Sequence, residues 1–140
     1  MVEPLERLTF FVDRSFGRRV VVDILRSAGF QVIALHERFP DETRDEHWLR
    51  VAGESGWIVL TKDKLREQAI ERRTAARFRV RVIIFKGKGL KGEELAALIV
   101  RHARGIERLC ASESRPFLAT LDRSGVHLRR PARDLLDRGE

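Results

Sequence analysis

The run from Trp57 to Thr61 constrains this chain most, because it is apolar without alternation and then turns polar at once. Its residues are Trp-Ile-Val-Leu-Thr, followed directly by Lys62, Asp63 and Lys64. A continuous stretch of β-branched and aromatic residues is typical of a strand covered on both faces of a parallel sheet. Ligands bind such sheets in the crevice outside the carboxyl ends of the strands. We therefore expect Asp63 to stand at a ligand-binding edge.

An earlier apolar segment, residues 8–12, ends in the same way, with Asp13 directly after it. Apolar residues at helical spacing predict a helix over about 17–28, and residues 30–35 predict a second strand. Two strands joined by a helical crossover are parallel, and the crossover connection is right-handed. Asp13 and Asp63 are therefore predicted to lie at one edge of one sheet.

The remaining elements continue the alternation of helix and strand. Asp45 is expected to open or cap a helix that ends at Gly56, a loop spans residues 36–44, and a basic helix follows over about 64–77. Residues 79–85 predict another strand and residues 93–111 a long helix. Two short strands around residues 122–125 predict a hairpin. We expect one α/β domain over 1–140, with a core of about 8–111, a hairpin of about 116–130 and a charged tail over 131–140.

Composition limits the cellular setting and the kinds of site. At 140 residues and 43% hydrophobic, the chain can bury one core. The only cysteine, Cys110, excludes an internal disulfide and a cysteine zinc site, and we expect it as a small apolar residue on a helix. No apolar run approaches the ~18–20 residues of a membrane span, and no signal peptide precedes the first strand. These features predict a cytoplasmic protein without a membrane partner.

The net charge of +7 is distributed unevenly. Residues 62–91 hold eleven Lys and Arg against three acids, whereas residues 37–46 hold five acids against two arginines. An acidic pocket within a basic surface suits a polyanion held near metal ions. A basic helix that is simply solvated would give the same count.

Three aspartates are predicted at the carboxyl edge: Asp13, Asp45 and Asp63. Clustered carboxylates without thiolates favour Mg²⁺ or Mn²⁺, ions that support phosphodiester hydrolysis in many nucleases. Thr61 could donate its hydroxyl to a metal-bound water or to Asp63, and Glu37 is the alternate further acid. Taken singly, each aspartate could equally cap a helix or belong to a turn.

The order Val12-Asp13, then Asp45 at a helix start, then Leu60-Thr61-Lys62-Asp63 resembles the PIN-like nuclease superfamily. It is similar in particular to compact VapC-type toxins of type II toxin–antitoxin pairs, over residues 8–85. The resemblance implies a three-layer α/β/α sandwich and a divalent-metal endoribonuclease that cleaves single-stranded or structured RNA. It also implies dimerisation and a small antitoxin partner. The matching acids are Asp13, Asp45 and Asp63, although Lys64-Leu65-Arg66 stands where many relatives have another acid.

We therefore predict that the basic segment binds RNA phosphates. Such contacts position the RNA chain without reading its sequence. The candidate residues are Lys62, Lys64, Arg66, Arg72, Arg73, Lys86 and Lys88.

Two other functions remain open. A flavodoxin-like phosphoacceptor domain also gathers acids at strand ends and places a lysine after a late strand, as Lys86 is placed here. Against it, such domains usually carry paired acids after the first strand, whereas Arg14 follows Asp13. The other possibility is a degenerate PIN-like domain that binds RNA or a partner without cleaving.

Overall fold

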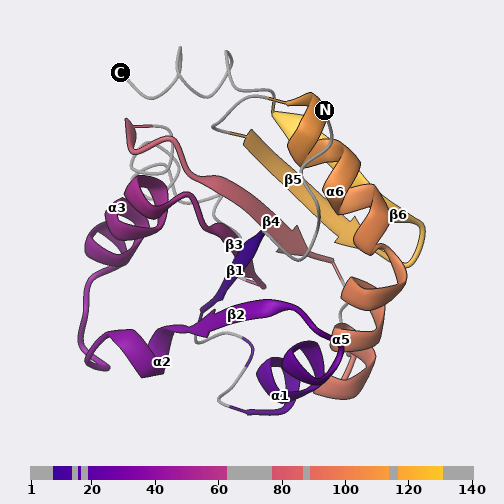
Figure 1. Cartoon of the computed structure of the whole chain (residues 1–140), viewed down its shortest axis with the longest axis horizontal. Coiled ribbons are helices and arrows are strands. Elements are labelled where there is room, and N and C mark those ends of the chain that lie inside the picture. Colours follow the sequence, from indigo (N-terminus) through magenta and orange to yellow (C-terminus); the bar gives the residue numbers. More distant parts are fainter. Residues whose placement is uncertain are drawn as a thin grey trace.

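The structure of the chain is a computed structural model that describes residues 8–13, 16, 19–62, 77–86, 89–113 and 117–130. Figure 1 shows one sheet with helices packed on both of its faces. In chain order the elements are β1 (Thr9–Val12), α1 (Val20–Ser27), β2 (Gln31–Ala34), α2 (Leu35–Arg38), α3 (Asp45–Ser55), β3 (Ile58–Thr61), β4 (Arg81–Phe85), α5 (Gly92–Arg101), α6 (Ala103–Ser112), β5 (Phe117–Asp122) and β6 (Gly125–Arg130). The predicted α/β class is confirmed. The basic helix expected over 64–77 lies outside the described residues except for its last position, and so does the tail over 131–140.

The strand order explains where a ligand can bind. The strands follow the order β2-β1-β3-β4-β5-β6, all parallel except the last pair, which is antiparallel. After β1 the chain adds β2 on one side, then returns past β1 and adds β3 on the other side. Strands β1 and β3 are therefore neighbours whose connections run in opposite directions. Such a topological switch point opens a crevice at the carboxyl ends of the two strands.

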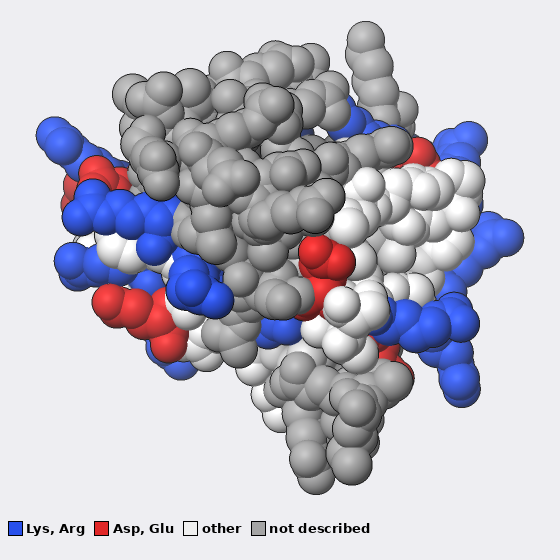
Figure 2. Space-filling model, turned by 90° about the horizontal axis from the view of Figure 1, so that it is seen from above, with Lys and Arg blue, Asp and Glu red and all other residues white. Residues whose placement is uncertain are grey.

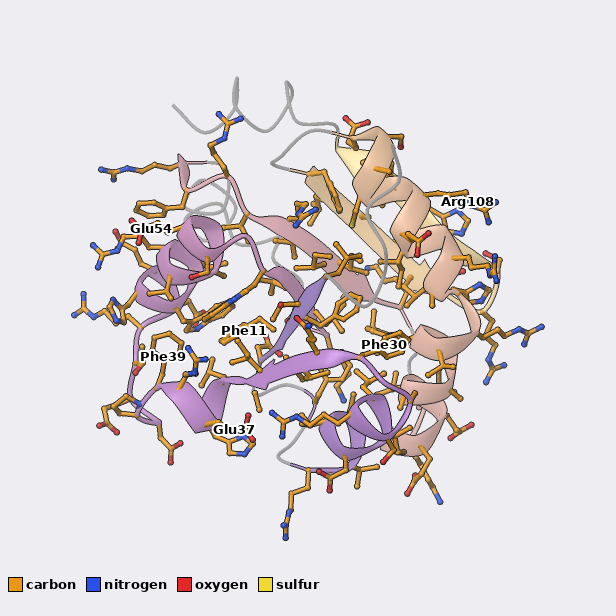
Figure 3. All side chains as sticks on the ribbon, viewed as in Figure 1. Phe11, Phe30, Glu37, Phe39, Glu54 and Arg108 are labelled. Atoms are coloured by element: carbon orange, nitrogen blue, oxygen red, sulfur yellow. The ribbon has the colours of Figure 1, made fainter. Side chains whose placement is uncertain are left out.

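Each face of the sheet carries its own core, because successive side chains of a strand point to opposite faces. Phe10 packs with α1, α5 and α6 on one face, and Phe11 packs with α3 on the other. Figure 3 shows Phe11 and Phe39 together beside α2 and α3, with Phe30 on the side of α1 and α5. The result is the three-layer α/β/α arrangement expected from the sequence. Cys110 lies on the buried face of α6, as predicted.

Two predicted elements differ from the structure in their extent. The strand expected over 79–85 begins at Arg81, because Arg79 has a φ of 62° and this left-handed backbone cannot continue a strand. The loop expected over 36–44 begins with the short helix α2, in which the Glu37 side chain accepts a hydrogen bond from the Ala34 N–H. Local backbone features, a left-handed residue and a capping contact, therefore set both boundaries.

The long helix expected over 93–111 is two helices, α5 and α6, which meet at His102. His102 Nε2 lies 3.2 Å from the carbonyl oxygen of Arg123 in the hairpin turn. Gly105 in α6 lets the hairpin approach closely, since an added Cβ would lie 3.2 Å from the Val126 side chain. The bend therefore lets α6 follow the hairpin, which itself forms where the sequence predicts it. Among the described residues, no helix is both long and apolar enough to cross a membrane.

Candidate active site

Asp13 and Thr61 form a buried polar pair at the switch point of the sheet. Asp13 directly follows β1 and is 3% exposed, and Thr61 ends β3 and is fully buried. The Thr61 hydroxyl donates a hydrogen bond to Asp13 Oδ2 (2.5 Å), and the Asp13 N–H donates to the Leu60 carbonyl (3.3 Å). We expected that Thr61 could donate to a metal-bound water or to Asp63; in the structure its hydroxyl donates to Asp13, and Asp63 lies outside the described residues. Asp13 is thus held at the edge where a ligand can meet it.

The side chains of this pair face the layer that contains α3. Asp13 lies two residues after Phe11 and Thr61 two after Val59, and both Phe11 and Val59 belong to the core under α3. Because strand side chains alternate with period two, the pair shares that face. Any further side chain that binds a ligand together with Asp13 should therefore come from this side of the sheet.

Asp45 is the first residue of α3, and its carboxylate is oriented by an aromatic side chain. The Trp48 indole N–H donates to Asp45 Oδ1 (3.0 Å), and the Trp48 ring stacks on Phe11 with centroids 5.3 Å apart. Arg44 occupies the N-cap position and α3 has no side-chain cap bond, so Asp45 is not the cap residue. The chain of contacts through Trp48 and Phe11 ties Asp45 to the face that carries Asp13.

Glu37, the alternate acid, is engaged elsewhere. Its two carboxylate oxygens accept hydrogen bonds from Arg26 of α1 (2.7 and 2.9 Å). This hydrogen-bonded guanidinium lowers the pKa of Glu37 to about 2. Arg26 also donates to the Val32 carbonyl, so the pair links α1, β2 and α2. Glu37 therefore has a structural explanation that needs no metal.

Lys62 and Lys86 are the two predicted RNA-binding residues that the structure describes. Lys62 follows Thr61 directly, is exposed, and places its Nζ 5.9 Å from the centroid of the Phe16 ring. Lys86 follows β4 and its N–H donates to the Leu121 carbonyl (2.8 Å). Both lie at carboxyl ends of strands, as does Asp13. Asp63 and the other candidate cations lie outside the described residues: Lys64, Arg66, Arg72, Arg73 and Lys88.

A serine, a histidine and an aspartate also meet in the hairpin turn, but not as a hydrolase triad. Asp122 Oδ1 accepts hydrogen bonds from the Ser124 N–H (2.8 Å) and hydroxyl (2.6 Å), which lowers the pKa of Asp122. The same ring nitrogen of His127, Nε2, lies close to both Ser124 Oγ (2.9 Å) and Asp122 (3.4 Å). In a triad the acid orients the histidine through its other nitrogen. These residues stabilise the turn.

Known proteins resemble this chain over the region that contains the predicted site residues. The family described as "PIN like domain" matches residues 8–87, a range that contains Asp13, Asp45, Thr61 and Asp63. The chain belongs to the PIN-like domain family. It is 31% identical over 121 residues to the "Putative ribonuclease VapC45" of Mycobacterium tuberculosis (strain ATCC 25618 / H37Rv), and this match covers 83% of the chain and 87% of the relative. No solved structure matches the chain.

This match decides between two fold families that strand order alone does not separate. The parallel order β2-β1-β3-β4-β5 is also that of flavodoxin-like domains. The family match covers more than half of the chain and assigns it to the PIN-like domains. The resemblance to VapC-type proteins is confirmed, and the phosphoacceptor interpretation loses its support.

The donor chemistry of this PIN-like domain fits a hard divalent cation. Carboxylate and hydroxyl oxygens are the ligands that Mg²⁺ and Mn²⁺ prefer, and buried carboxylates are paired, hydrogen-bonded or bound to metals. Within the described ranges, no three His, Cys, Asp or Glu side chains gather closely enough to hold a metal ion. Asp13 and Asp45 are the predicted site acids whose positions the structure describes, and Asp63 lies outside the described residues.

The contribution of Trp48 was not anticipated from the sequence. Trp48 comes three residues after Asp45 in the sequence, a spacing that brings side chains together on one helical face. This spacing is visible in the sequence. However, the stacking on Phe11 and the hydrogen bond to Asp45 both depend on the tertiary fold.

Proposed function

We propose that this PIN-like domain is a divalent-metal-dependent endoribonuclease and the toxin of a type II toxin–antitoxin pair. The observation that carries the proposal is the buried Asp13–Thr61 pair at the switch point between β1 and β3. Open α/β sheets bind their ligands at this position. The mycobacterial relative is named as a ribonuclease, which supports RNA as the substrate.

In the proposed site, the carboxylates of Asp13, Asp45 and Asp63 hold Mg²⁺ or Mn²⁺. Asp63 comes two residues after Thr61 in the sequence, just beyond the carboxyl end of β3. When bound, the ion supplies positive charge that stabilises the phosphodiester as it is cleaved. Thr61 keeps the Asp13 carboxylate in one orientation through its hydrogen bond. Trp48 does the same for Asp45.

The substrate backbone is held by cations at the same edge. Lys62 and Lys86 are the described members of this set, with Lys64, Arg66, Arg72, Arg73 and Lys88 proposed alongside them. Such contacts fix the register of a strand but carry no sequence information. The VapC-type relationship further supports a small antitoxin partner and a homodimer. An RNA substrate and an antitoxin both imply action in the cytoplasm.

Cleavage of RNA by purified protein tests this proposal. Asp13→Asn should lower the Mn²⁺-dependent cleavage rate of a labelled RNA by roughly 100-fold or more, since it removes a proposed ligand charge. Asp23→Asn is the matched control, because it makes the same change at an exposed position of α1 and should leave the rate unchanged. Circular dichroism should show that both variants are folded.

Two outcomes separate the alternatives. Equal Mn²⁺-dependent cleavage by Asp13→Asn and Asp23→Asn would show that Asp13 is not a ligand. RNA binding that weakens with salt, without cleavage in Mg²⁺ or Mn²⁺ by the unmodified protein, would instead identify a degenerate binding domain.

A further inference from the structure

A basic pocket with an aromatic wall lies on α3, on the side away from the sheet. Its volume is about 180 Å³, and its lining residues are Arg44, Glu46, His47, Arg50 and Phe78. The first four come from α3 and its N-cap, and Phe78 comes from the segment before β4. This pocket shares no residue with the cations named above for the carboxyl edge.

The charge of the pocket favours an anion. Arg44 and Arg50 are exposed, and in the described part of the chain no carboxylate forms an ion pair with either. Arg77 and Arg79 flank Phe78 and are exposed as well. Figure 2 shows Lys and Arg side chains projecting on the side of α3, at the left, with acidic side chains among them. Glu46 is the single acid in the pocket lining, so cations outnumber it.

Aromatic rings in the pocket are held in place rather than loosely exposed. The backbone at Phe78 packs so closely on α3 that an added Cβ at Gly53 would clash with the Phe78 carbonyl oxygen. The His47 ring meets Phe39 edge to face with centroids 5.6 Å apart, and Phe39 in turn packs against Phe11. The Arg77 guanidinium lies 5.4 Å from the centroid of the Phe78 ring. Fixed aromatic and guanidinium faces are surfaces on which unpaired nucleobases stack.

The pocket and the proposed active site both include residues at the N-terminal end of α3. Arg44 directly precedes Asp45, and Arg50 lies five residues further along α3 than Asp45. An α-helix rises about 1.5 Å per residue, which puts Arg50 roughly 8 Å along the helix axis from Asp45. The pocket therefore lies close to Asp45 along α3, on the solvent-facing side of the helix.

We infer that this pocket binds one nucleotide of single-stranded RNA next to the cleaved bond. Arg44 and Arg50 bind its phosphate, and Phe78 and His47 contact its base. The inference rests on the proposed function for its orientation relative to the cleaved bond, but the binding itself is independent of cleavage. It adds a second RNA contact on α3 to the cations of the carboxyl edge.

The chain offers a matched control in a second pocket of similar size. That cavity, of about 220 Å³, is lined by Leu90, Glu94, Ala97, Leu98, Arg101 and Arg123. It also combines two arginines with one glutamate, but its remaining walls are aliphatic. Removing its two arginines changes the net charge by the same amount as removing Arg44 and Arg50.

The experiment measures the binding of a fluorescein-labelled single-stranded RNA of about twelve nucleotides by anisotropy, with EDTA to prevent cleavage. Arg44→Gln/Arg50→Gln should weaken binding roughly 10-fold, and the slope of log Kd against log salt should fall by about 0.7, the value for the one phosphate that the two arginines bind. Phe78→Leu should weaken binding roughly 5-fold or more, with an unchanged slope, because stacking carries no charge. Arg101→Gln/Arg123→Gln should change Kd less than the Arg44 and Arg50 pair does.

If the two double variants weakened RNA binding equally, the inference would be overturned, because the loss of net charge alone would then explain the effect. Unchanged RNA binding by Arg44→Gln/Arg50→Gln would overturn it too, even if that variant lost a protein partner instead. A failure of the proposed function would appear separately. Cleavage would then survive Asp13→Asn, while the binding results in EDTA would stand.

Discussion

Replacing Thr61 with valine should destabilise the protein, because the change removes the hydroxyl that donates to a buried carboxylate. Thr61 is fully buried and Asp13 is 3% exposed, so water cannot take the place of the lost donor without rearrangement. A hydrogen bond to a charged group contributes about 1.5–3 kcal/mol. The added methyl group recovers up to about 0.8 kcal/mol of apolar burial. The lost hydrogen bond therefore dominates, and we expect a net loss of about 1–2 kcal/mol in the free energy of unfolding.

Urea denaturation followed by tryptophan fluorescence measures this loss. Both tryptophans, Trp48 and Trp57, stack on Phe11 in the core beside the site and report its unfolding. The expected change lowers Tm by roughly 3–6 °C for a domain of this size. Thr9→Val is the control: its hydroxyl donates to Gln31 at the surface (3.0 Å), so its change should stay within about 0.5 kcal/mol. A Thr61→Val protein as stable as the unmodified one would refute the reasoning.

Two further predictions use Glu37 and Trp48. The pKa of Glu37 is lowered to about 2, so its ion pair stabilises the fold above about pH 4.5 and this contribution is lost as pH falls toward 2. Glu37→Gln should therefore lower the free energy of unfolding by less than about 1 kcal/mol near neutral pH, and urea titrations should show the difference vanish in acid. Trp48→Phe keeps a ring on Phe11 but removes the donor to Asp45, and should weaken Mn²⁺ binding roughly 10-fold in a calorimetric titration. Trp57→Phe trims the other ring on Phe11 and should not weaken Mn²⁺ binding. Equal Mn²⁺ affinities in the two variants would contradict the role of Trp48.

Much of the sheet could be predicted because its strands carry their own signals. The apolar runs that end at Asp13 and Thr61 are buried strands in the structure, and the hairpin forms around its turn residues. Local pattern could not predict the bend between α5 and α6, because that bend depends on contacts of His102 and Gly105 with the distant hairpin. It also missed the left-handed Arg79, whose backbone angle has no signature in its neighbours.

The candidate site was predictable in position but not in its hydrogen bonds. Carboxyl ends of parallel strands share an edge, so Asp13 could be assigned to that edge from sequence alone. That β1 and β3 are neighbours, and that Thr61 therefore reaches Asp13, depends on strand order. Glu37 was a candidate ligand because it comes just past the end of the second predicted strand. Its pairing with Arg26, eleven residues earlier, could not be predicted, because only the packing of α1 brings the two together. Whether Asp63 joins Asp13 stays a prediction.

Direct binding of Mn²⁺ tests the central claim, that Asp13 is part of a divalent-metal site at the switch point of the sheet. Free Mn²⁺ gives an electron paramagnetic resonance signal that is lost on binding, so a titration yields the affinity without any RNA. We predict that Asp13→Asn weakens binding by roughly 10-fold or more, while Asp23→Asn binds as the unmodified protein does. Unchanged Mn²⁺ affinity in Asp13→Asn would contradict the account.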